Sequence, residues 1–285
     1  MRPFSIFFAV LLSSTLVFAH RPQKKGLGTI LCITRKCMFP VGNCIFRPSC
    51  KNCINCMERC EEKEMDDHEA CAAECFLKLG TPQFSRMAAC AMNSGCIKST
   101  EALSNKKSPK TIPSKLDGQF NLHDLTGHLY FARGISPSYP RMDCMHVIAT
   151  AHQQKGRLDF KVVYPVPERN LTRSFEYSMQ EKAPGSSSFW TKFEVFGMKS
   201  DEQIYILDMI EGFYLFVITG KGFGGEYQHA VVYSREPSNH VPSEIEDRFD
   251  KVLEDAGLYE YMPRLSDFKG VPYGNPICKA FLPRM

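Results

Sequence analysis

The sequence predicts a mainly β protein: an eight-stranded up-and-down barrel, preceded by a small disulfide-rich α-helical domain and followed by a C-terminal helix. Three observations predict this: a run of short alternating segments, a block of cysteines at helical spacing, and one amphipathic stretch near the end. The alternating segments are Gly127–Gly134, Cys144–Ala151, Arg157–Tyr164, Ser174–Met179, Ser188–Gly197, Gln203–Met209, Gly212–Thr219 and Gln228–Ser234.

Each of these segments has the pattern of a strand with one buried and one exposed face. In the third, Leu158, Phe160 and Val162 alternate with Asp159 and Lys161. Eight short antiparallel strands close most simply into a barrel, which removes exposed edges and can hold one small ligand. A two-sheet sandwich is the alternative, and we favour the barrel.

The chain begins like an exported protein. A short positive segment precedes the apolar run Phe4–Phe18, which is shorter than the about 20 residues that span a bilayer. Small residues up to Ala19 fit a signal peptidase site. We therefore expect a signal peptide over residues 1–19, no transmembrane segment in the mature chain, and secretion to the extracellular space. The start does not resemble a plastid transit peptide.

Composition and charge divide the remaining chain into two domains and a linker. The formal charge is +4 with both signs mixed throughout, which does not indicate a nucleic-acid partner. Lysines and prolines between 104 and 115 indicate a solvated tether rather than a basic binding patch. We expect a cysteine-rich domain at 20–99, a linker at 100–116, the barrel at 117–236, and a helix with a tethered tail at 237–285.

The cysteine block predicts two antiparallel helices joined by disulfides. Thirteen cysteines in an exported chain indicate disulfides. Residues four apart share one face of a helix, so two CxxxC pairs can cross-link as rungs, Cys56 to Cys75 and Cys60 to Cys71. Zinc at Cys50, Cys53 and Cys56 is the alternative, and a redox-active CxxC is a second. The odd count leaves one thiol, and Cys53 breaks the regular spacing.

Two further features concern the surface and the end of the chain. Asn170 begins the one N-glycosylation sequon, near a turn, and we expect a glycoprotein. Ser243 and Glu246 have the spacing of a capping box that begins a helix with one apolar stripe, ending near Gly257. This helix should pack on the outside of the barrel. Cys278 is the natural partner of Cys144, and this bridge would tie the tail to the barrel.

No strong catalytic motif is present. There is no Gly-x-Ser-x-Gly, His-Glu-x-x-His or phosphate-binding glycine loop. His146 and His152 share a face of one strand, but two histidines do not predict a metal site. Asp143, Asp201 and Glu202 lie at strand ends and could donate protons if buried.

The cysteine order is the most specific feature. Cys32-x4-Cys37-x6-Cys44-x5-Cys50 leads into the two CxxxC pairs, and this order resembles that of violaxanthin de-epoxidase, a lipocalin-fold enzyme with a cysteine-rich amino-terminal domain. The resemblance covers nearly the whole mature chain. It continues through Phe120-Asn121-Leu122, Asp124, Gly127, Tyr130, Asp143-Cys144, Tyr205-Ile206-Leu207, Phe216-Val217 and Ala230-Val231-Val232-Tyr233-Ser234-Arg235.

The resemblance implies a lipocalin-like barrel, a disulfide pattern and an activity. The implied pairs are Cys32–Cys50, Cys37–Cys44, Cys56–Cys75, Cys60–Cys71, Cys90–Cys96 and Cys144–Cys278, with Cys53 as the free thiol. The family enzyme removes the epoxide oxygen of a carotenoid with ascorbate as reductant. Its acid corresponds here to Glu202, a glutamate in place of aspartate, and its tyrosine to Thr219. Asp143 and Tyr233 are kept, so the candidate catalytic residues are Glu202, Asp143 and Tyr233.

These departures favour a secreted protein that binds a hydrophobic, carotenoid- or isoprenoid-like ligand in its barrel. The alternative is an ascorbate-dependent de-epoxidase that uses Glu202, and a structural extracellular-matrix protein is a third hypothesis. We expect no metal and no bound cofactor, with ascorbate as co-substrate in the enzyme reading. We also expect a monomer that can contact a membrane surface.

Overall fold

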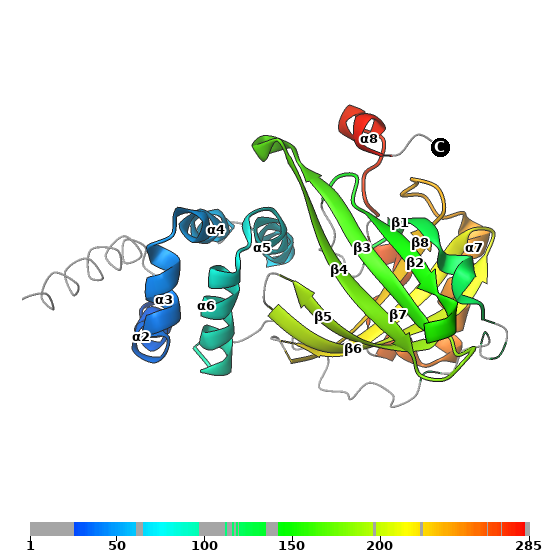
Figure 1. Cartoon of the computed structure of the whole chain (residues 1–285), viewed down its shortest axis with the longest axis horizontal. Helices are drawn as coiled ribbons and strands as arrows, with labels where there is room; N and C mark the ends of the chain where they lie inside the picture. The colour runs from blue at the N-terminus through cyan, green and yellow to red at the C-terminus, as the bar shows by residue number, and fades with distance from the viewer. Residues whose placement is uncertain are drawn as a thin grey trace, which may run out of the picture.

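The computed structural model describes residues 26–60, 65–96, 112, 116, 118, 120–134, 142–195, 198–222, 225–260, 262–268 and 270–282, and all structural statements concern these. The predicted signal peptide and most of the predicted linker lie outside the described residues. Figure 1 shows a group of helices beside a strongly curved sheet, with one further helix packed on the outside of that sheet.

The sheet is a closed barrel of eight antiparallel strands, as predicted. Each strand pairs with the next in sequence, and β1 pairs with β8 (Figure 1). This closure excludes the two-sheet sandwich. The strands are β1 (Gly127–Arg133), β2 (His146–His152), β3 (Arg157–Val166), β4 (Leu171–Glu181), β5 (Ser188–Val195), β6 (Met198–Ile210), β7 (Phe213–Gly222) and β8 (Gly225–Ser234).

The barrel has two distinct ends. The far end holds the connections β2–β3, β4–β5 and β6–β7, and the short helix η1 (Leu122–Leu125) precedes β1 there. The near end holds the connections β3–β4, β5–β6 and β7–β8, and it faces the helices (Figure 1). Pairing between β4 and β5 is limited to three residue pairs, from Met179 with Thr191 to Glu181 with Phe189, so these strands diverge toward the near end.

Among the described residues, five α-helices precede the barrel: α2 (Gly26–Lys36), α3 (Met38–Ile45), α4 (Pro48–Glu58), α5 (Met65–Leu79) and α6 (Pro82–Asn93). Two predicted rungs, Cys56–Cys75 and Cys60–Cys71, join α4 to α5. Cys53 is the free thiol and is buried. The zinc alternative is wrong, because Cys50 and Cys56 are in disulfides.

Three of the pairings implied by the resemblance are wrong. Instead of Cys32–Cys50, Cys37–Cys44 and Cys90–Cys96, the structure has Cys32–Cys96, Cys37–Cys90 and Cys44–Cys50. Helix geometry explains the second case. Two residues seven apart in a helix are separated by about 10 Å along its axis, whereas disulfide Cα atoms are at most about 7 Å apart. The bridges to Cys90 and Cys96 instead tie α2 and the start of α3 to α6.

The predicted helix near the end of the chain is α7 (Ser243–Asp255), and it packs on the outside of the barrel. Its buried Ile245, Phe249 and Leu253 contact the outward Tyr205 and Leu207 of β6 in one apolar cluster.

The predicted capping box does not form. Pro242 is the N-cap residue without a side-chain cap. The Glu246 carboxylate instead accepts two hydrogen bonds from Arg133 of β1, at 3.1 and 3.2 Å.

The tail after α7 returns to β1 and β2. The Cys144–Cys278 bridge ties α8 (Pro276–Phe281) to the turn before β2. The Tyr273 hydroxyl donates to the Met145 carbonyl at 2.6 Å and accepts the Phe131 N–H at 2.8 Å, so it joins β1 to β2. None of the described helices has the length and apolar character needed to cross a membrane.

Candidate functional site

The far half of the barrel interior is a packed aromatic core. Tyr233 lies at its centre, 2% exposed, with ring centroids 4.8 Å from Phe131 and 5.0 Å from Phe216. Phe160 completes the cluster, with its ring 6.3 Å from the rings of Phe216 and Tyr233. Such edge-to-face and tilted packing fills the space between the strands. This half of the interior is therefore core.

The near half of the interior keeps exposed surface. Ile204, Ile206, Ile218 and Val231 belong to the interior cluster, so alternation turns Glu202 of β6 and His229 of β8 inward as well. Both side chains are only half-buried, as is the inward Phe175 of β4. Inward residues that retain accessible surface indicate that this half is not filled by side chains. We take this half of the interior as the candidate ligand site.

Glu202 is an acidic group of this site, on the inner face of β6 with Ile204 and Ile206. It lies opposite Thr191 on β5 and Gly220 on β7. Its Oε1 accepts a hydrogen bond from the Ser200 hydroxyl at 3.1 Å. The buried Thr191 hydroxyl has no hydrogen-bond partner among the described residues. Gly220 carries no side chain, so β7 places no side-chain atoms directly beside Glu202.

His229 is a functional candidate that the sequence analysis missed. It lies opposite Ile218, which lies opposite Ile204, so the imidazole belongs to the row next to Glu202. Burial lowers the pKa of His229 to about 4, and the imidazole is therefore neutral at physiological pH. A neutral imidazole can donate one hydrogen bond and accept another. The strand pattern of Gln228–Ser234 could have revealed it, because His229 lies two residues before the inward Val231.

The other predicted catalytic residues do not join Glu202. Tyr233 pairs with Tyr214 and Glu202 pairs with Gly220, and six residues along β7 correspond to about 20 Å. Thr219 lies on the outer face of β7, because Phe216 and Ile218 point inward.

Asp143 lies in the turn before β2, where it helps to hold the C-terminal tail. Its carboxylate accepts the Asn275 amide at 2.6 Å, beside the Cys144–Cys278 bridge. Burial raises the pKa of Asp143, and the hydrogen bond from Asn275 opposes that rise. This contact secures the tail. The structure therefore leaves Glu202 as the one member of the predicted catalytic set in the candidate ligand site.

The last turn of α5 covers part of the near end. Leu77 is buried in the interior cluster, and its carbonyl accepts hydrogen bonds from the Tyr164 hydroxyl at 2.9 Å and from Arg173 at 2.8 Å. Arg173 also donates to the Gly80 carbonyl at 2.9 Å. The helical domain is therefore fixed to β3 and β4 at the entrance of the candidate site.

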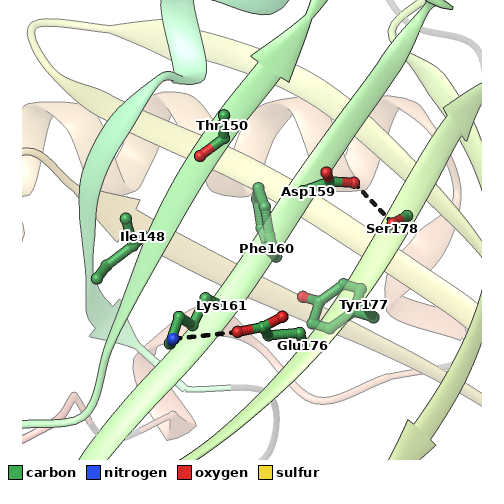
Figure 2. A pocket seen from close by; sticks show the side chains of 8 residues that line it. All are labelled: Ile148, Thr150, Asp159, Phe160, Lys161, Glu176, Tyr177 and Ser178. Atoms are coloured by element: carbon green, nitrogen blue, oxygen red, sulfur yellow. Dashed lines mark hydrogen bonds and ion pairs between the residues drawn. The ribbon is translucent and has the colours of Figure 1, made fainter.

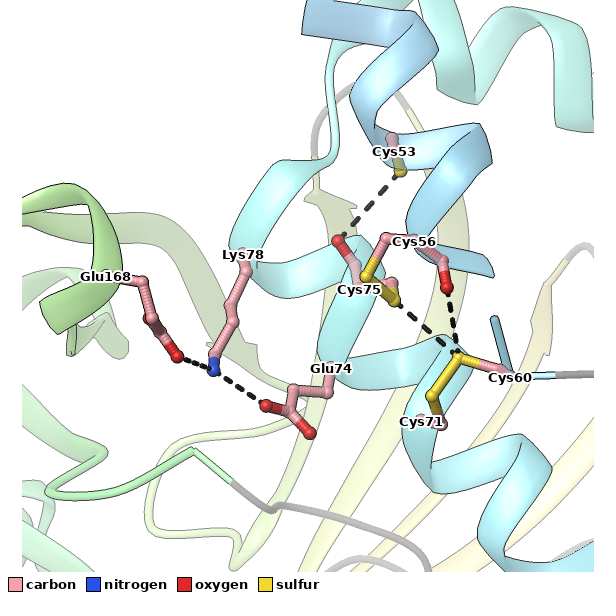
Figure 3. Close-up of a disulfide and its surroundings, with 8 residues drawn as sticks. All are labelled: Cys53, Cys56, Cys60, Cys71, Glu74, Cys75, Lys78 and Glu168. Carbon is pink, nitrogen blue, oxygen red and sulfur yellow. Dashed lines mark hydrogen bonds and ion pairs between the residues drawn. A yellow bond between two sulfur atoms is a disulfide. The ribbon is translucent and has the colours of Figure 1, made fainter. Parts of the chain in front are cut away.

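An ion pair and the free thiol lie beside this contact. Lys78 bridges Glu74 of α5 and Glu168 of the β3–β4 turn, at 2.7 and 2.6 Å (Figure 3). Cys53 is 3.9 Å from the carbonyl of Cys75 (Figure 3). Burial raises the pKa of the Cys53 thiol to about 12, which suppresses the reactive thiolate. We therefore assign the Lys78 ion pairs and the buried Cys53 thiol a role in stability and not in ligand binding.

A separate depression of about 350 Å³ lies along β2, β3 and β4. Figure 2 shows its polar side chains paired with one another across neighbouring strands: Asp159 with Ser178 at 2.6 Å and Lys161 with Glu176 at 3.1 Å. Side chains already satisfied in this way do not point to a ligand. We therefore favour the interior over this outer depression.

Comparison with known proteins agrees with the architecture. A family model described as the VDE lipocalin domain matches residues 29–262. Violaxanthin de-epoxidase of Arabidopsis thaliana is 23% identical over 261 residues, which cover 87% of this chain and 54% of the relative. The spinach enzyme (Spinacia oleracea) is 23% identical over 154 residues, covering 53% of this chain and 31% of the relative. This chain thus spans about half the length of the Arabidopsis relative, or less in the spinach case.

Two solved structures match a little over half of this chain. The cockroach allergen Per a 4 has a TM-score of 0.39 at 11% identity and covers 57% of this chain and 95% of its own. The siderocalin Ex-FABP has a TM-score of 0.40 at 14% identity and covers 54% of this chain and 97% of its own. The family model spans most of the chain, including both the disulfide-bonded helices and the closed barrel. This chain belongs to the VDE lipocalin domain family.

Proposed function

We propose that this protein is a secreted lipocalin-type binding protein that holds one elongated, hydrophobic ligand, of carotenoid or isoprenoid type, in the near half of its barrel. The far half, filled by Tyr233 and its aromatic neighbours, forms the floor of the site. Glu202 and His229 supply polar groups on the walls. Apolar pockets with a few well-placed polar groups are typical of small-molecule sites.

One observation carries the proposal: the inward aromatic side chains around Tyr233 are fully buried in the far half of the barrel, whereas Glu202, His229 and Phe175 keep exposed surface in the near half. Phe160 and Phe216 are each 1% exposed, whereas Glu202 and His229 are half-buried although they point inward. A barrel that served only as a stable scaffold would gain by filling this volume, because unfilled space costs packing energy. The retained space supports ligand binding.

The experiment fills the site from one position and uses its neighbour as control. Ile218→Trp adds volume inside the near half, whereas Thr219→Trp adds the same side chain on the outer face of the same strand. We expect Ile218→Trp to abolish binding of a carotenoid or of a fluorescent apolar probe, and Thr219→Trp to bind like the parent. Equal binding by both variants would refute an interior site. Mass spectrometry of molecules extracted from the purified parent identifies the natural ligand.

The export proposal has its own support at the β3–β4 turn. Asn170 is exposed there with a positive φ of 47°, so its side chain is accessible to glycosylation. The six disulfides also fit an oxidising route. We expect protein released from a secretory host to lose mass on treatment with an N-glycosidase, and Asn170→Gln to abolish that change. Retention inside the host would contradict export.

A second candidate function is ascorbate-dependent de-epoxidation. It is favoured by the inward carboxyl of Glu202, because the epoxide oxygen must be protonated as the ring opens. Ascorbate would supply two electrons, and the oxygen would leave as water. Thr219 lies outside the barrel and cannot assist. We expect no turnover of violaxanthin above background. Turnover that is lost in Glu202→Gln but kept in Asp201→Asn, an exposed neighbour, would establish the enzyme instead.

A further inference from the structure

The helices farthest from the barrel expose large apolar side chains. Figure 1 shows α2 and α3 at the edge of the helical domain opposite the barrel. Leu31 is 62% exposed, Met38 55%, Phe39 83% and Phe46 63%. Of the seven exposed large apolar residues in the described chain, these four lie within one stretch of 16 residues, from Leu31 to Phe46. An exposed phenylalanine is costly in water, so a concentration of this kind marks a contact surface.

Helix geometry places the two phenylalanines together. Cys37, Val41 and Cys44 are buried on the inner side of α3, toward α4 and α6. Phe39 and Phe46 are seven residues apart, or about two turns, so they share one helix face. That face is opposite the buried stripe. We call it the outer face of α3, and it consists of Phe39 and Phe46 with Met38 at its edge.

The charges around this face are of one sign. From Gly26 to Met57 the sequence holds four basic residues and no acidic one. The basic residues are Arg35, Lys36, Arg47 and Lys51, and all are exposed. Helix α6, which supports α2 and α3, also has no acidic residue. The acidic residues of the helical domain all lie later in the sequence, between Glu58 and Glu74.

We propose that the outer face of α3, with the basic residues beside it, docks on the surface of a lipid bilayer that contains anionic lipids. Exposed aromatic side chains that insert at the headgroup level, flanked by lysine and arginine, are the arrangement that binds such a surface. A protein partner would need an acidic and apolar surface that matches this face in shape. An anionic bilayer offers negative charge and apolar depth over its whole surface, so we favour the bilayer. This docking is independent of the interior ligand site.

The test measures co-flotation of the protein with vesicles. The full chain is expressed in a secretory host and purified from the medium with its disulfides formed. Vesicles of phosphatidylcholine alone are compared with vesicles that also contain phosphatidylserine, at low and at high salt. We expect binding to the phosphatidylserine vesicles, weakened by salt because screening shortens the range of the charges.

Two double variants test the two components. Phe39→Ser with Phe46→Ser should weaken vesicle binding by roughly tenfold or more, because two exposed apolar side chains are lost from the contact. Arg35→Gln with Arg47→Gln should weaken binding to phosphatidylserine vesicles by roughly 25-fold, about fivefold for each charge. All four side chains are exposed, so the fold should tolerate these changes, and near-ultraviolet circular dichroism checks this.

Matched controls lie on the barrel. Trp190→Ser removes a 52% exposed aromatic residue of β5, and Lys155→Gln with Lys192→Gln removes two exposed charges. These variants should bind vesicles like the parent. Absence of vesicle binding by the parent overturns the proposal. The proposal is also overturned if the control variants lose as much vesicle binding as the test variants. If Phe39→Ser with Phe46→Ser instead converts a dimer to a monomer without vesicles, the face joins two copies and the proposal is wrong.

Discussion

Replacing Tyr273 by phenylalanine removes only one hydroxyl group, yet it should destabilise the barrel strongly. The Tyr273 hydroxyl donates to the Met145 carbonyl at 2.6 Å and accepts the Phe131 N–H at 2.8 Å, and the side chain is only 6% exposed. Phenylalanine fills the same space but leaves a buried carbonyl and a buried N–H without partners. Each such group costs about 1–3 kcal/mol, so we expect the free energy of unfolding to fall by about 2–4 kcal/mol.

Urea denaturation followed by tryptophan fluorescence measures this loss in the barrel itself. Trp190 of β5 is the only tryptophan in the sequence, and Lys182 lies 4.6 Å from its ring. The midpoint should fall while the slope with urea stays the same, because the surface exposed on unfolding is unchanged.

Tyr205→Phe is the matched control. That hydroxyl donates to the Gln203 side chain at 2.6 Å and accepts from the Lys182 ammonium at 3.2 Å, groups that water can satisfy in its absence. Its loss should cost less than about 1 kcal/mol. A Tyr273→Phe protein with the midpoint of the parent would refute the reasoning. An equal loss in Tyr205→Phe would show that the buried bridge between β1 and β2 does not determine the cost.

Three further predictions concern the cysteines and pH. Peptide mapping without reduction should recover the long-range bridges Cys32–Cys96 and Cys37–Cys90, and recovery of Cys37–Cys44 would contradict the helix packing. Cys53 should resist alkylation in the native protein and react after denaturation, because burial raises its pKa to about 12; rapid native labelling would show that it is accessible. His229 should destabilise the protein in acid: burial lowers its pKa from 6.5 to about 4, so its contribution is present above pH 6.5 and lost as the pH falls toward 4. The unfolding free energy of His229→Leu should therefore fall less between neutral pH and pH 5 than that of the parent.

The strands could be predicted because their signal is local. Alternation in a segment such as Arg157–Tyr164 depends only on which residues face the interior, and all eight predicted segments are strands. The rungs Cys56–Cys75 and Cys60–Cys71 could be predicted for the same reason, since four-residue spacing fixes a shared helix face.

The bridges of Cys90 and Cys96 could not be predicted from spacing. Helix α6 ends at Asn93, and the chain turns at Gly95, whose φ is 68°. The Cys96 N–H then bonds back to the Ala91 carbonyl at 2.8 Å. This turn directs Cys96 toward Cys32, while Cys90 stays on the helix beside Cys37. The result depends on how α2, α3 and α6 pack together, which no short pattern encodes. His229 was missed for a related reason, since only pairing through β7 brings β8 close to Glu202.

The long-range bridges also determine the order in which the chain can mature. Cys32 and Cys37 leave the ribosome well before their partners, which lie 64 and 53 residues further along the chain. During that interval Cys32 and Cys37 are each other's nearest thiols and Cys44 and Cys50 come next, so short loops favour pairing among these four. Native pairing then requires attack by a thiolate on a bond already formed. Recovery of the reduced, unfolded chain should therefore proceed over seconds to hours and accelerate with a disulfide isomerase.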